Sequence, residues 1–383
     1  MEITAENFSF RFGAYGTSVH ITPVLPGIDE IAGAFGGEYF RPLIVCDENT
    51  EALAVKIAGV QKAPLCILKA GEANKGWPAA EAILQKAYEA GLNRDGTLIG
   101  VGGGLVCDLC AFAASIYMRG CSLALVPSSL LCMADACIGG KTGFDLFGIK
   151  NLAGTFYPAS HVFLSAQSLA SLPLPEWKSG MAEIIKTAVL DSEDFLDELE
   201  AVTTMFPKGS FAKGFPPDFA PVMLGRGIDL LSRCVGRAVQ FKGGIVEEDP
   251  LETGSRRILL NLGHSFGHAL ESSAGLGKIT HGEAVAWGIA RSCDLGISLG
   301  ICPRRRAEKI TELLSAFGYE TSAPHPLMEN SAAFIQALGG DKKKREGKFT
   351  FIVPDKNSAR PVTADASSLL DTVNRIIIGE LPF

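Results

Sequence analysis

The segment Thr97-Leu-Ile-Gly-Val-Gly-Gly-Gly104 runs directly into Leu105-Val-Cys-Asp-Leu-Cys-Ala-Phe-Ala-Ala114. Its apolar start predicts a buried β-strand, its consecutive glycines a tight turn, and its end an α-helix. Glycines let the backbone approach an anion closely, and the free N–H groups that open a helix favour negative charge. The segment therefore predicts a cradle for the diphosphate of a dinucleotide. Because it is not a strict G-x-G-x-x-G, a plain strand–helix turn is the alternative.

Short β-rich runs alternate with helical patterns throughout the first half of the chain. The helical spacing is clearest over residues 77–90, and Asp95-Gly96 is a turn signal before the next strand. This alternation is typical of βαβ units and a mainly parallel sheet. The predicted strands cover residues 42–46, 65–68, 97–101, 123–126 and 162–164. We therefore expect an α/β, Rossmann-like, dinucleotide-binding domain over residues 1–174.

From Pro175 onward, helical patterns replace the strand patterns. A stretch rich in Pro, Gly and Phe, residues 206–221, predicts a loop, and residues 346–353 predict a late strand or hairpin. The predicted helices cover residues 181–190, 225–241, 262–274, 283–299 and 304–317. We expect residues 175–383 to form an all-α domain that binds a metal and the substrate.

Composition limits the possible partners. Hydrophobic residues make up 47% of the 383 residues, which is typical of a well-packed globule. The formal net charge of −7 argues against nucleic acid as a partner, because such proteins usually carry a broad basic face. The acidic start, Met1-Glu-Ile-Thr-Ala-Glu6, differs from a secretory signal, and no apolar run approaches the ~20 residues that span a bilayer. We therefore expect a cytoplasmic protein without a membrane partner.

The ten cysteines are scattered through apolar segments, where cysteine behaves as a small hydrophobic residue. Cys107 and Cys110 form a C-x-x-C pair, but no second pair at ligand spacing follows. We expect the cysteines to be reduced and buried, without a redox or metal role.

Three of the six histidines fall close together and indicate a metal site. His264 and His268 are four residues apart on one predicted helix, and His281 begins the next. Glu183 lies in an apolar helix, where an unpaired charge would be costly, so we expect it to be a further ligand. Two histidines and one glutamate would leave an open coordination position, as in catalytic zinc sites. The alternative for Glu183 is a buried pair with Lys186.

Basic and amide residues next to glycines predict an anion pocket. Lysine offers a point charge and arginine a two-pronged donor for phosphate or carboxylate. In the second half, Arg257 and Asn261 are one α-helical turn apart and are expected to face the same side. The charge run over residues 341–345 is by default a solvated turn, with one lysine as a candidate to close over a phosphate. The candidate set is Arg119, Lys141, Lys150, Asn151, Lys242, Arg256, Arg257 and Asn261.

Taken together and in this order, the motifs resemble those of the 3-dehydroquinate synthase family of sugar phosphate cyclases, over nearly the whole chain. The motifs are Gly102-Gly-Gly104 with Asp108, Tyr117-Met-Arg-Gly120, Gly139-Gly-Lys-Thr-Gly143, Lys150-Asn151, Met181-Ala-Glu-Ile-Ile-Lys186, Asn261-Leu-Gly-His-Ser-Phe-Gly-His268 and His281-Gly-Glu283.

This resemblance implies a phosphate lyase that converts 3-deoxy-D-arabino-heptulosonate 7-phosphate to 3-dehydroquinate and phosphate in the shikimate pathway. It implies bound NAD, a divalent metal that is zinc with cobalt as an alternative, and a homodimer. NAD takes up and returns a hydride while the metal lowers the pKa of the substrate hydroxyl. Glu183, His264 and His281 would bind the metal, and His268 would lie beside the substrate.

The resemblance also implies roles for the other candidates. Lys141, Asn151 and Lys186 would hold the phosphate and hydroxyl groups of the substrate, and Arg119 would reach across the dimer. Lys242, Arg257 and Asn261 would hold its carboxylate. The residues expected at NAD are Asp47, Glu72, Lys75, Gly103, Gly104, Asp108, Ser128, Ser129, Asp135, Lys141 and Lys150.

The sequence departs from the family pattern at several positions. Asp145 replaces a common Asn, Ser128-Ser129 a usual Thr pair, and Pro250-Leu251 interrupts a normally charged turn. The spacing from Lys242 to Arg257 is one residue longer than in the family pattern. Either Arg256 or Arg257 is therefore the candidate ligand of the substrate carboxylate. The substrate is therefore open, with sedoheptulose 7-phosphate and glucose 6-phosphate as alternatives.

Two other classes remain as alternatives. A metal-dependent polyol dehydrogenase would share the glycine loop and the metal site, but a neutral polyol needs no basic cluster. A catalytically silent homologue would keep the fold, but no folding requirement explains the metal ligands and the basic cluster together.

Overall fold

The computed structural model describes residues 6–37, 40–60, 62–254, 256–275, 277–328, 331–340 and 348–381. The chain forms two compact units. Unit 1 comprises Met1–Leu172 and Leu231–Leu251, and unit 2 comprises Pro173–Leu230 and Glu252–Phe383. Each is described by itself.

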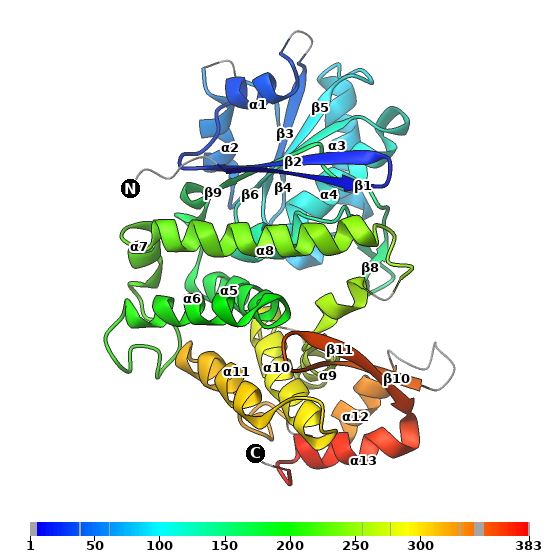
Figure 1. Cartoon of the computed structure of the whole chain (residues 1–383). Coiled ribbons are helices and arrows are strands. Elements are labelled where there is room, and N and C mark those ends of the chain that lie inside the picture. The colour runs from blue at the N-terminus through cyan, green and yellow to red at the C-terminus, as the bar shows by residue number, and fades with distance from the viewer. Residues whose placement is uncertain are drawn as a thin grey trace. The chain divides into compact units, whose positions relative to one another are not determined.

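Unit 1 is built on a seven-stranded sheet with the order β1-β2-β9-β6-β5-β3-β4 (Figure 1). An antiparallel pair, β1 and β2, forms one edge, and the remaining neighbours are parallel. The strands are β1 Glu6–Phe12, β2 Tyr15–Thr22, β3 Pro42–Asp47, β4 Leu65–Leu68, β5 Thr97–Gly102, β6 Ser122–Pro127 and β9 His161–Ser165. The predicted α/β fold with a mainly parallel sheet is confirmed.

Alternating residues of the central strands pack against helices on opposite faces of this sheet. Ile99 and Val101 share a buried cluster with residues of α1 and α2. Between them, Gly100 lies against Cys110 of α4. A parallel sheet that is buried on both faces explains the continuous apolar runs in its strands. The helices are α1 Ile28–Ala34, α2 Glu51–Ala58, α3 Trp77–Glu89 and α4 Gly104–Ile116.

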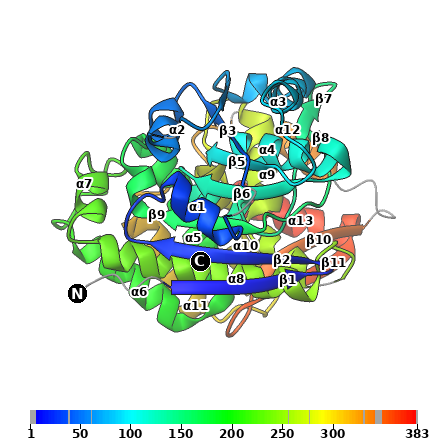
Figure 2. The ribbon, with the colours of Figure 1, turned by 90° about the horizontal axis from the view of Figure 1, so that it is seen from above.

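The sequence did not predict the β1–β2 pair, the small β7–β8 pair described next, or that the predicted helix over residues 225–241 belongs partly to unit 1. A small antiparallel pair, β7 Phe144–Leu146 and β8 Ile149–Ala153, follows the glycine-rich Gly139–Gly143 segment. The C-terminal part of α8, which spans Ile228–Glu248, belongs to unit 1 and lies against β1, since Gly243 leaves no room for a side chain beside the Phe10 ring (Figure 2).

Unit 2 is mainly helical but contains one hairpin, so the expectation of an all-α domain was too strict. The hairpin pairs β10, Lys348–Pro354, with β11, Ala359–Asp365. The charge run over residues 341–345 lies outside the described residues. The helices are α5 Leu174–Asp191, α6 Glu193–Thr204, α7 Phe219–Leu224, α9 His264–Ala274, α10 His281–Ser298, α11 Arg304–Ala316, α12 Ser331–Gly340 and α13 Ala366–Ile377.

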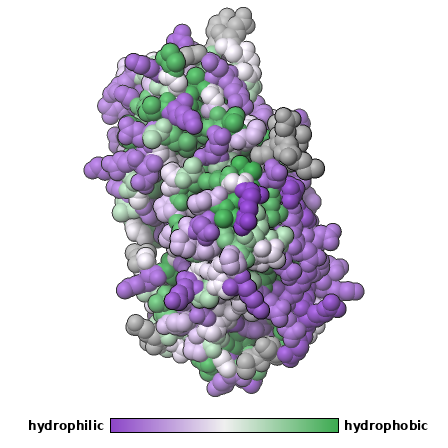
Figure 3. All heavy atoms as spheres, turned by 90° about the vertical axis from the view of Figure 1, so that its left-hand side faces the viewer, coloured by the Kyte–Doolittle hydropathy of each residue, from purple (hydrophilic) through white to green (hydrophobic). Residues whose placement is uncertain are grey.

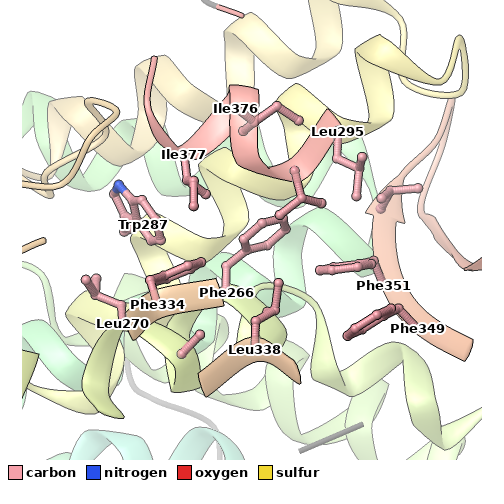
Figure 4. Packing of buried hydrophobic residues seen from close by; sticks show 13 residues of the cluster. Phe266, Leu270, Trp287, Leu295, Phe334, Leu338, Phe349, Phe351, Ile376 and Ile377 are labelled. Carbon is pink, nitrogen blue, oxygen red and sulfur yellow. The ribbon is translucent and has the colours of Figure 1, made fainter. Parts of the chain in front are cut away.

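The core of unit 2 forms where the hairpin, α9, α10, α12 and α13 contribute apolar side chains to one cluster (Figure 4). Phe266 packs at 5.0 Å from Phe351, and Trp287 at 5.8 Å from Phe334, measured between ring centroids. Outside this core, Lys309 of α11 pairs with Glu193 and Asp197 at α6. Figure 3 shows the side of the molecule on which α6 and α11 lie, with hydrophilic residues gathered at the lower right.

Glycines let α9 and α10 approach closely, which fixes the position of their histidines. A side chain at Gly288 would lie 2.0 Å from the Gly263 carbonyl oxygen, and one at Gly267 would lie 2.9 Å from that of Ala284. Any larger residue would separate the two helices. Within the described residues, no helix combines the length and the apolar character needed to cross a membrane.

The predicted burial of the cysteines is confirmed. All ten cysteines are free and buried. Burial raises the pKa of Cys46 to about 12 and that of Cys121 to about 11, so these thiols stay protonated near neutral pH.

Candidate active site

The glycine cradle of unit 1 connects β5 to α4 without an intervening loop. A Cβ atom on Gly102 would lie 2.5 Å from the Cβ of Val106, so the strand end passes directly under the first helical turn. Ser128 donates its backbone N–H to the Gly102 carbonyl at 2.8 Å, and Ser129 Oγ lies 3.4 Å from where a Gly103 Cβ would stand. The predicted NAD residues Gly103, Gly104, Ser128 and Ser129 are therefore neighbours, and the helix start can receive a diphosphate.

A hydrogen-bond network around the buried Lys75 adjoins this cradle. Lys75 donates to Asp108 Oδ2 at 2.6 Å and to Asn151 Oδ1 at 2.7 Å. Asn151 has a left-handed backbone, with a φ of 51°, and its N–H donates to Asp145 Oδ1 at 2.8 Å. Burial raises the pKa of Asp108 to about 6 against the opposing effect of Lys75. Asp145, which departs from the common Asn, thus positions a predicted substrate residue.

The structure brings together two residues that were predicted for different ligands. Lys242 Nζ lies 2.6 Å from the backbone oxygen of Asp135 and 2.9 Å from its Oδ2. Lys242 was predicted at the substrate carboxylate and Asp135 at NAD. Because Lys242 is buried, this contact fixes the position of its ammonium group.

The other predicted residues of unit 1 are less constrained. Asp47 Oδ1 accepts hydrogen bonds from the N–H groups of Asn49 and Thr50, which order the turn after β3. This is the ordinary loop role. Arg119 has a left-handed φ of 70°. Four of the remaining predicted site residues of unit 1 have exposed side chains: Glu72, Arg119, Lys141 and Lys150.

In unit 2, Glu183 of α5 meets His264 of α9 and His281 of α10. Glu183 Oε1 lies 3.8 Å from His264 Nε2 and 3.5 Å from His281 Nε2. One ligand atom from each of the three residues lies within 4.8 Å of the other two. These separations allow a single metal ion to be shared after small side-chain movements.

Both imidazoles present Nε2 to Glu183 because an oxygen holds Nδ1. His264 Nδ1 lies 3.2 Å from the Leu262 carbonyl, and His281 Nδ1 lies 3.4 Å from Glu271 Oε2. This arrangement orients metal-binding histidines in known sites. The sequence analysis missed Glu271, although its spacing places it on the same face of α9 as the two histidines of that helix.

The carboxylate of Glu183 supports the metal assignment most directly. It is 2% exposed, and among the described residues neither of its oxygens has a hydrogen-bond partner. Lys186 Nζ lies 2.5 Å from Oε2 as an ion pair. Burial works to raise the pKa of Glu183, but Lys186 and the two histidines outweigh it and hold that pKa well below its usual range. The buried pair with Lys186 that the sequence left as an alternative is thus present at Oε2, while Oε1 faces the two imidazoles, where an ionised carboxylate fits a divalent cation.

The pKa values of His264 and His281 shift in opposite directions. Burial, reinforced by Lys186, lowers the pKa of His264 to about 3, so its Nε2 is free to bind a metal. Burial also works to lower the pKa of His281, but Glu183 and Glu271 raise it to about 10. A metal that binds here would displace the proton from His281.

His268 lies at the rim of this cluster. Its ring centroid is 5.3 Å from that of His264 and 5.8 Å from that of His281, and the side chain is exposed. With Glu271 and His281 it forms a second group of possible ligands. The arrangement leaves His268 beside the cluster, where it can exchange protons with a ligand.

The expected side-by-side placement of Arg257 and Asn261 is wrong. They lie in a 3₁₀-helix, Arg257–Asn261, where residues three apart align and residues four apart do not. Arg257 is buried, whereas Asn261 and Arg256 are exposed. Of these three residues, only Arg257 therefore lies within the packed part of unit 2.

Family models match almost three quarters of the chain. The model described as 3-dehydroquinate synthase N-terminal matches residues 65–179, and the one described as 3-dehydroquinate synthase C-terminal matches residues 180–344. Together they include the cradle, Glu183 and the three histidines.

Relatives and solved structures agree with these matches. A 3-dehydroquinate synthase of Rhodopirellula baltica is 34% identical over 84% of this chain and 79% of its own length, and one of Caulobacter vibrioides is 35% identical over 86% and 87%. The structure of 2-epi-5-epi-valiolone synthase from Streptomyces hygroscopicus subsp. jinggangensis, with NAD+ and Zn2+ bound, is 25% identical, covers 98% of this chain and 100% of that one, and has a TM-score of 0.75. A 2-deoxy-scyllo-inosose synthase shares the fold at 21% identity and a TM-score of 0.75, over 98% of this chain and 99% of that one. The chain therefore belongs to the 3-dehydroquinate synthase family.

Proposed function

We propose that the chain converts 3-deoxy-D-arabino-heptulosonate 7-phosphate to 3-dehydroquinate and phosphate, with NAD and a divalent metal as cofactors. The relatives at 34–35% identity support the substrate, and the buried carboxylate of Glu183, without a hydrogen-bond partner among the described residues, carries the chemistry. When bound, NAD supplies a hydride acceptor and the metal a Lewis acid that lowers the pKa of a substrate hydroxyl. No net oxidation results.

The residues of unit 2 have distinct proposed roles. Glu183, His264 and His281 hold the metal, which we propose to be zinc because nitrogen and oxygen ligands suit it. Lys186 keeps Glu183 ionised at 2.5 Å and offers an ammonium group to substrate oxygens. His268, exposed beside the cluster, moves protons to and from the substrate. Of the pair Arg257 and Asn261, we keep Arg257 as the candidate for its carboxylate.

In unit 1, we propose that the glycine cradle and Ser128-Ser129 bind NAD, together with Asp108 and Asp135. Lys75 positions Asp108 and Asn151 through its two hydrogen bonds. Lys141 and Asn151 bind the phosphate and hydroxyl groups of the substrate, and Lys242, held by Asp135, binds its carboxylate. The remaining candidates, Asp47, Glu72 and Lys150, contribute at the rim of the NAD site.

We also propose a homodimer in which Arg119 serves the partner subunit. Exposed apolar side chains surround it in sequence, since Ile116 is 38% exposed and Met118 is 46% exposed. Such residues are typical of surfaces that another chain covers. We assign the reaction to the cytoplasm because all ten cysteines are free thiols.

The test is to incubate the protein with NAD, zinc and 3-deoxy-D-arabino-heptulosonate 7-phosphate while following phosphate, the carbocyclic product and NADH absorbance. We expect phosphate and product in equal amounts without accumulation of NADH. Turnover of sedoheptulose 7-phosphate or glucose 6-phosphate in its place would contradict the proposed substrate but not the proposed cofactors and reaction type. Accumulation of NADH with neutral polyols would contradict the proposed lyase activity and indicate a polyol dehydrogenase.

A further inference from the structure

Unit 2 contains a hollow of about 470 Å³ to which the proposed reaction assigns no role. It is lined by residues of α5, the α6–α7 connection, the start of α10 and the segment that follows α11. The volume lies within the ~300–1,000 Å³ that is typical of small-molecule sites. Lysines, a histidine and aromatic rings line it together: Lys178, Phe211, Lys213, Lys278, Tyr319 and His325.

Two of the three lysines at this hollow have their charge available for a ligand. Lys213 and Lys278 are exposed, and among the described residues neither has an ion-pair partner. Lys178 is already engaged, since its Nζ lies 2.7 Å from Glu283 Oε1 and 5.4 Å from the centroid of the Tyr319 ring. The second carboxylate at the hollow, Glu320, accepts a hydrogen bond from the Ser322 N–H. Glu320 keeps its negative charge, so the hollow carries three lysines against two carboxylates, an excess of one positive charge.

His325 adds a buried donor. The side chain is only 6% exposed, and its Nδ1 accepts a hydrogen bond from the Leu327 N–H at 3.0 Å. Burial lowers its pKa, so the ring is neutral and Nε2 carries the proton. In the part of the chain that the structure describes, Nε2 has no hydrogen-bond partner. Because His325 lines the hollow, this N–H can donate to the acceptor of a bound ligand.

The apolar wall of the hollow is rigid. Phe211 packs at 5.7 Å from Phe317, and Tyr319 donates its hydroxyl to the Lys178 carbonyl at 2.5 Å. Gly318 has a φ of 72°, and a Cβ atom there would lie 2.4 Å from the Phe211 carbonyl oxygen. These contacts hold the two rings in place before any ligand binds, which reduces the entropic cost of binding.

We propose that this hollow binds a small organic anion. Lys213, Lys278 and His325 Nε2 hold its phosphate or carboxylate head, and its apolar body lies against Phe211 and Tyr319. The site is separate from the metal cluster, because Glu283 lies about 200° around α10 from His281 at 3.6 residues per turn. The role of the metal ligands is therefore independent of this proposal.

The test follows the ring resonance of His325 in isotopically histidine-labelled protein loaded with NAD and zinc. Only six histidines are present, and His325→Gln assigns the signal by its loss. We expect phenyl phosphate, benzoate or both to shift this resonance saturably, whereas neutral phenol leaves it unchanged. Lys213→Glu/Lys278→Glu should weaken binding at least 10-fold and leave turnover unchanged. Lys208→Glu, which is exposed on the same connection but does not line the hollow, is the matched control.

Four outcomes would overturn the proposal. The first is a His325 resonance that neither anion moves. The second is an equal shift with phenol. The third is unchanged binding in the double charge-reversal variant. The fourth is inorganic phosphate binding as tightly as phenyl phosphate, because the apolar wall would then contribute nothing. A response to only one of the two organic anions supports the proposal and identifies the head group.

Discussion

The Lys75 network of unit 1 and the Glu183 cluster of unit 2 are each centred on a buried charged side chain, but they differ in how their charges are satisfied. Lys75 gives hydrogen bonds to Asp108 and Asn151, at 2.6 and 2.7 Å. Glu183 lies beside Lys186 and two histidines, yet its oxygens have no hydrogen-bond partner among the described residues. The first network is complete within the chain. In the second, Glu183 pairs with Lys186 through Oε2, and its Oε1 faces the two imidazoles, where we propose the metal.

The largest expected effect is on the Glu183 cluster. His264→Ala removes one of three metal ligands, so metal content should fall to near zero and turnover by at least about 10³-fold, since the metal contributes several kcal/mol to the transition state. Metal analysis and kcat measure these two effects, and circular dichroism checks the fold. The matched variant His268→Ala should lose turnover but keep its metal. Normal metal content in His264→Ala would remove His264 from the ligand set.

Metal removal should lower the free energy of unfolding through the Glu183 cluster and not through the Lys75 network. A ligand present at 100 times its Kd stabilises the folded state by about 2.7 kcal/mol, so chelation should lower the urea midpoint of the wild type. Glu183→Gln should abolish this difference between metal-loaded and metal-free protein, whereas Asp108→Asn should retain it. An equal loss in both variants would show that the clusters are not independent.

The Lys75 network should lose stability when its shared hydrogen-bond donor is removed, whether or not a metal is bound. Lys75→Met leaves the acceptors Asp108 and Asn151 without their shared donor, which should destabilise the fold by about 1–3 kcal/mol. Adding Asp108→Asn should recover part of this loss, because the buried carboxylate is then absent. Urea unfolding of the two single variants and the double variant measures the coupling. Purely additive effects would contradict a shared network.

The smallest expected effect is a pH dependence from Asp108. Its pKa is raised to about 6 in the folded protein, above the ~3.9 of an exposed aspartate. The folded state therefore binds more protons than the unfolded state between these values, and the contribution of Asp108 to stability declines as the pH rises through 6. Asp108→Asn should flatten this part of the profile of unfolding free energy against pH. A wild-type slope that persists in the variant would assign it to another group.

The fold was largely predictable because it depends on local patterns. Residues 77–90 predicted a helix by their apolar spacing, and α3 spans Trp77–Glu89. The predicted helix over residues 225–241 was too short, since α8 spans Ile228–Glu248. The apolar spacing does not mark where a helix ends when no capping signal is present. The β7–β8 pair was missed because its strands are short and mostly exposed, so they carry little alternation.

The candidate site was predictable only in part. The spacing of His264 and His268 on one helix indicates their proximity from sequence alone, and their rings lie 5.3 Å apart. Arg257 and Asn261 have the same four-residue spacing, but their segment folds as a 3₁₀-helix, which places them differently. A four-residue spacing is informative only when the helix type is known.

By itself, the sequence determined the features that neighbouring residues encode: the strand, glycine turn and helix of residues 97–114, the alternation of strands and helices, and the histidines at helical spacing. Only the tertiary structure decided which distant residues meet. It placed β9 between β2 and β6, joined Glu183 to His281, and set Asn151 on Lys75. The physical reason is that backbone geometry propagates over a few residues, whereas these contacts join segments 37 or more residues apart through packing of the whole unit.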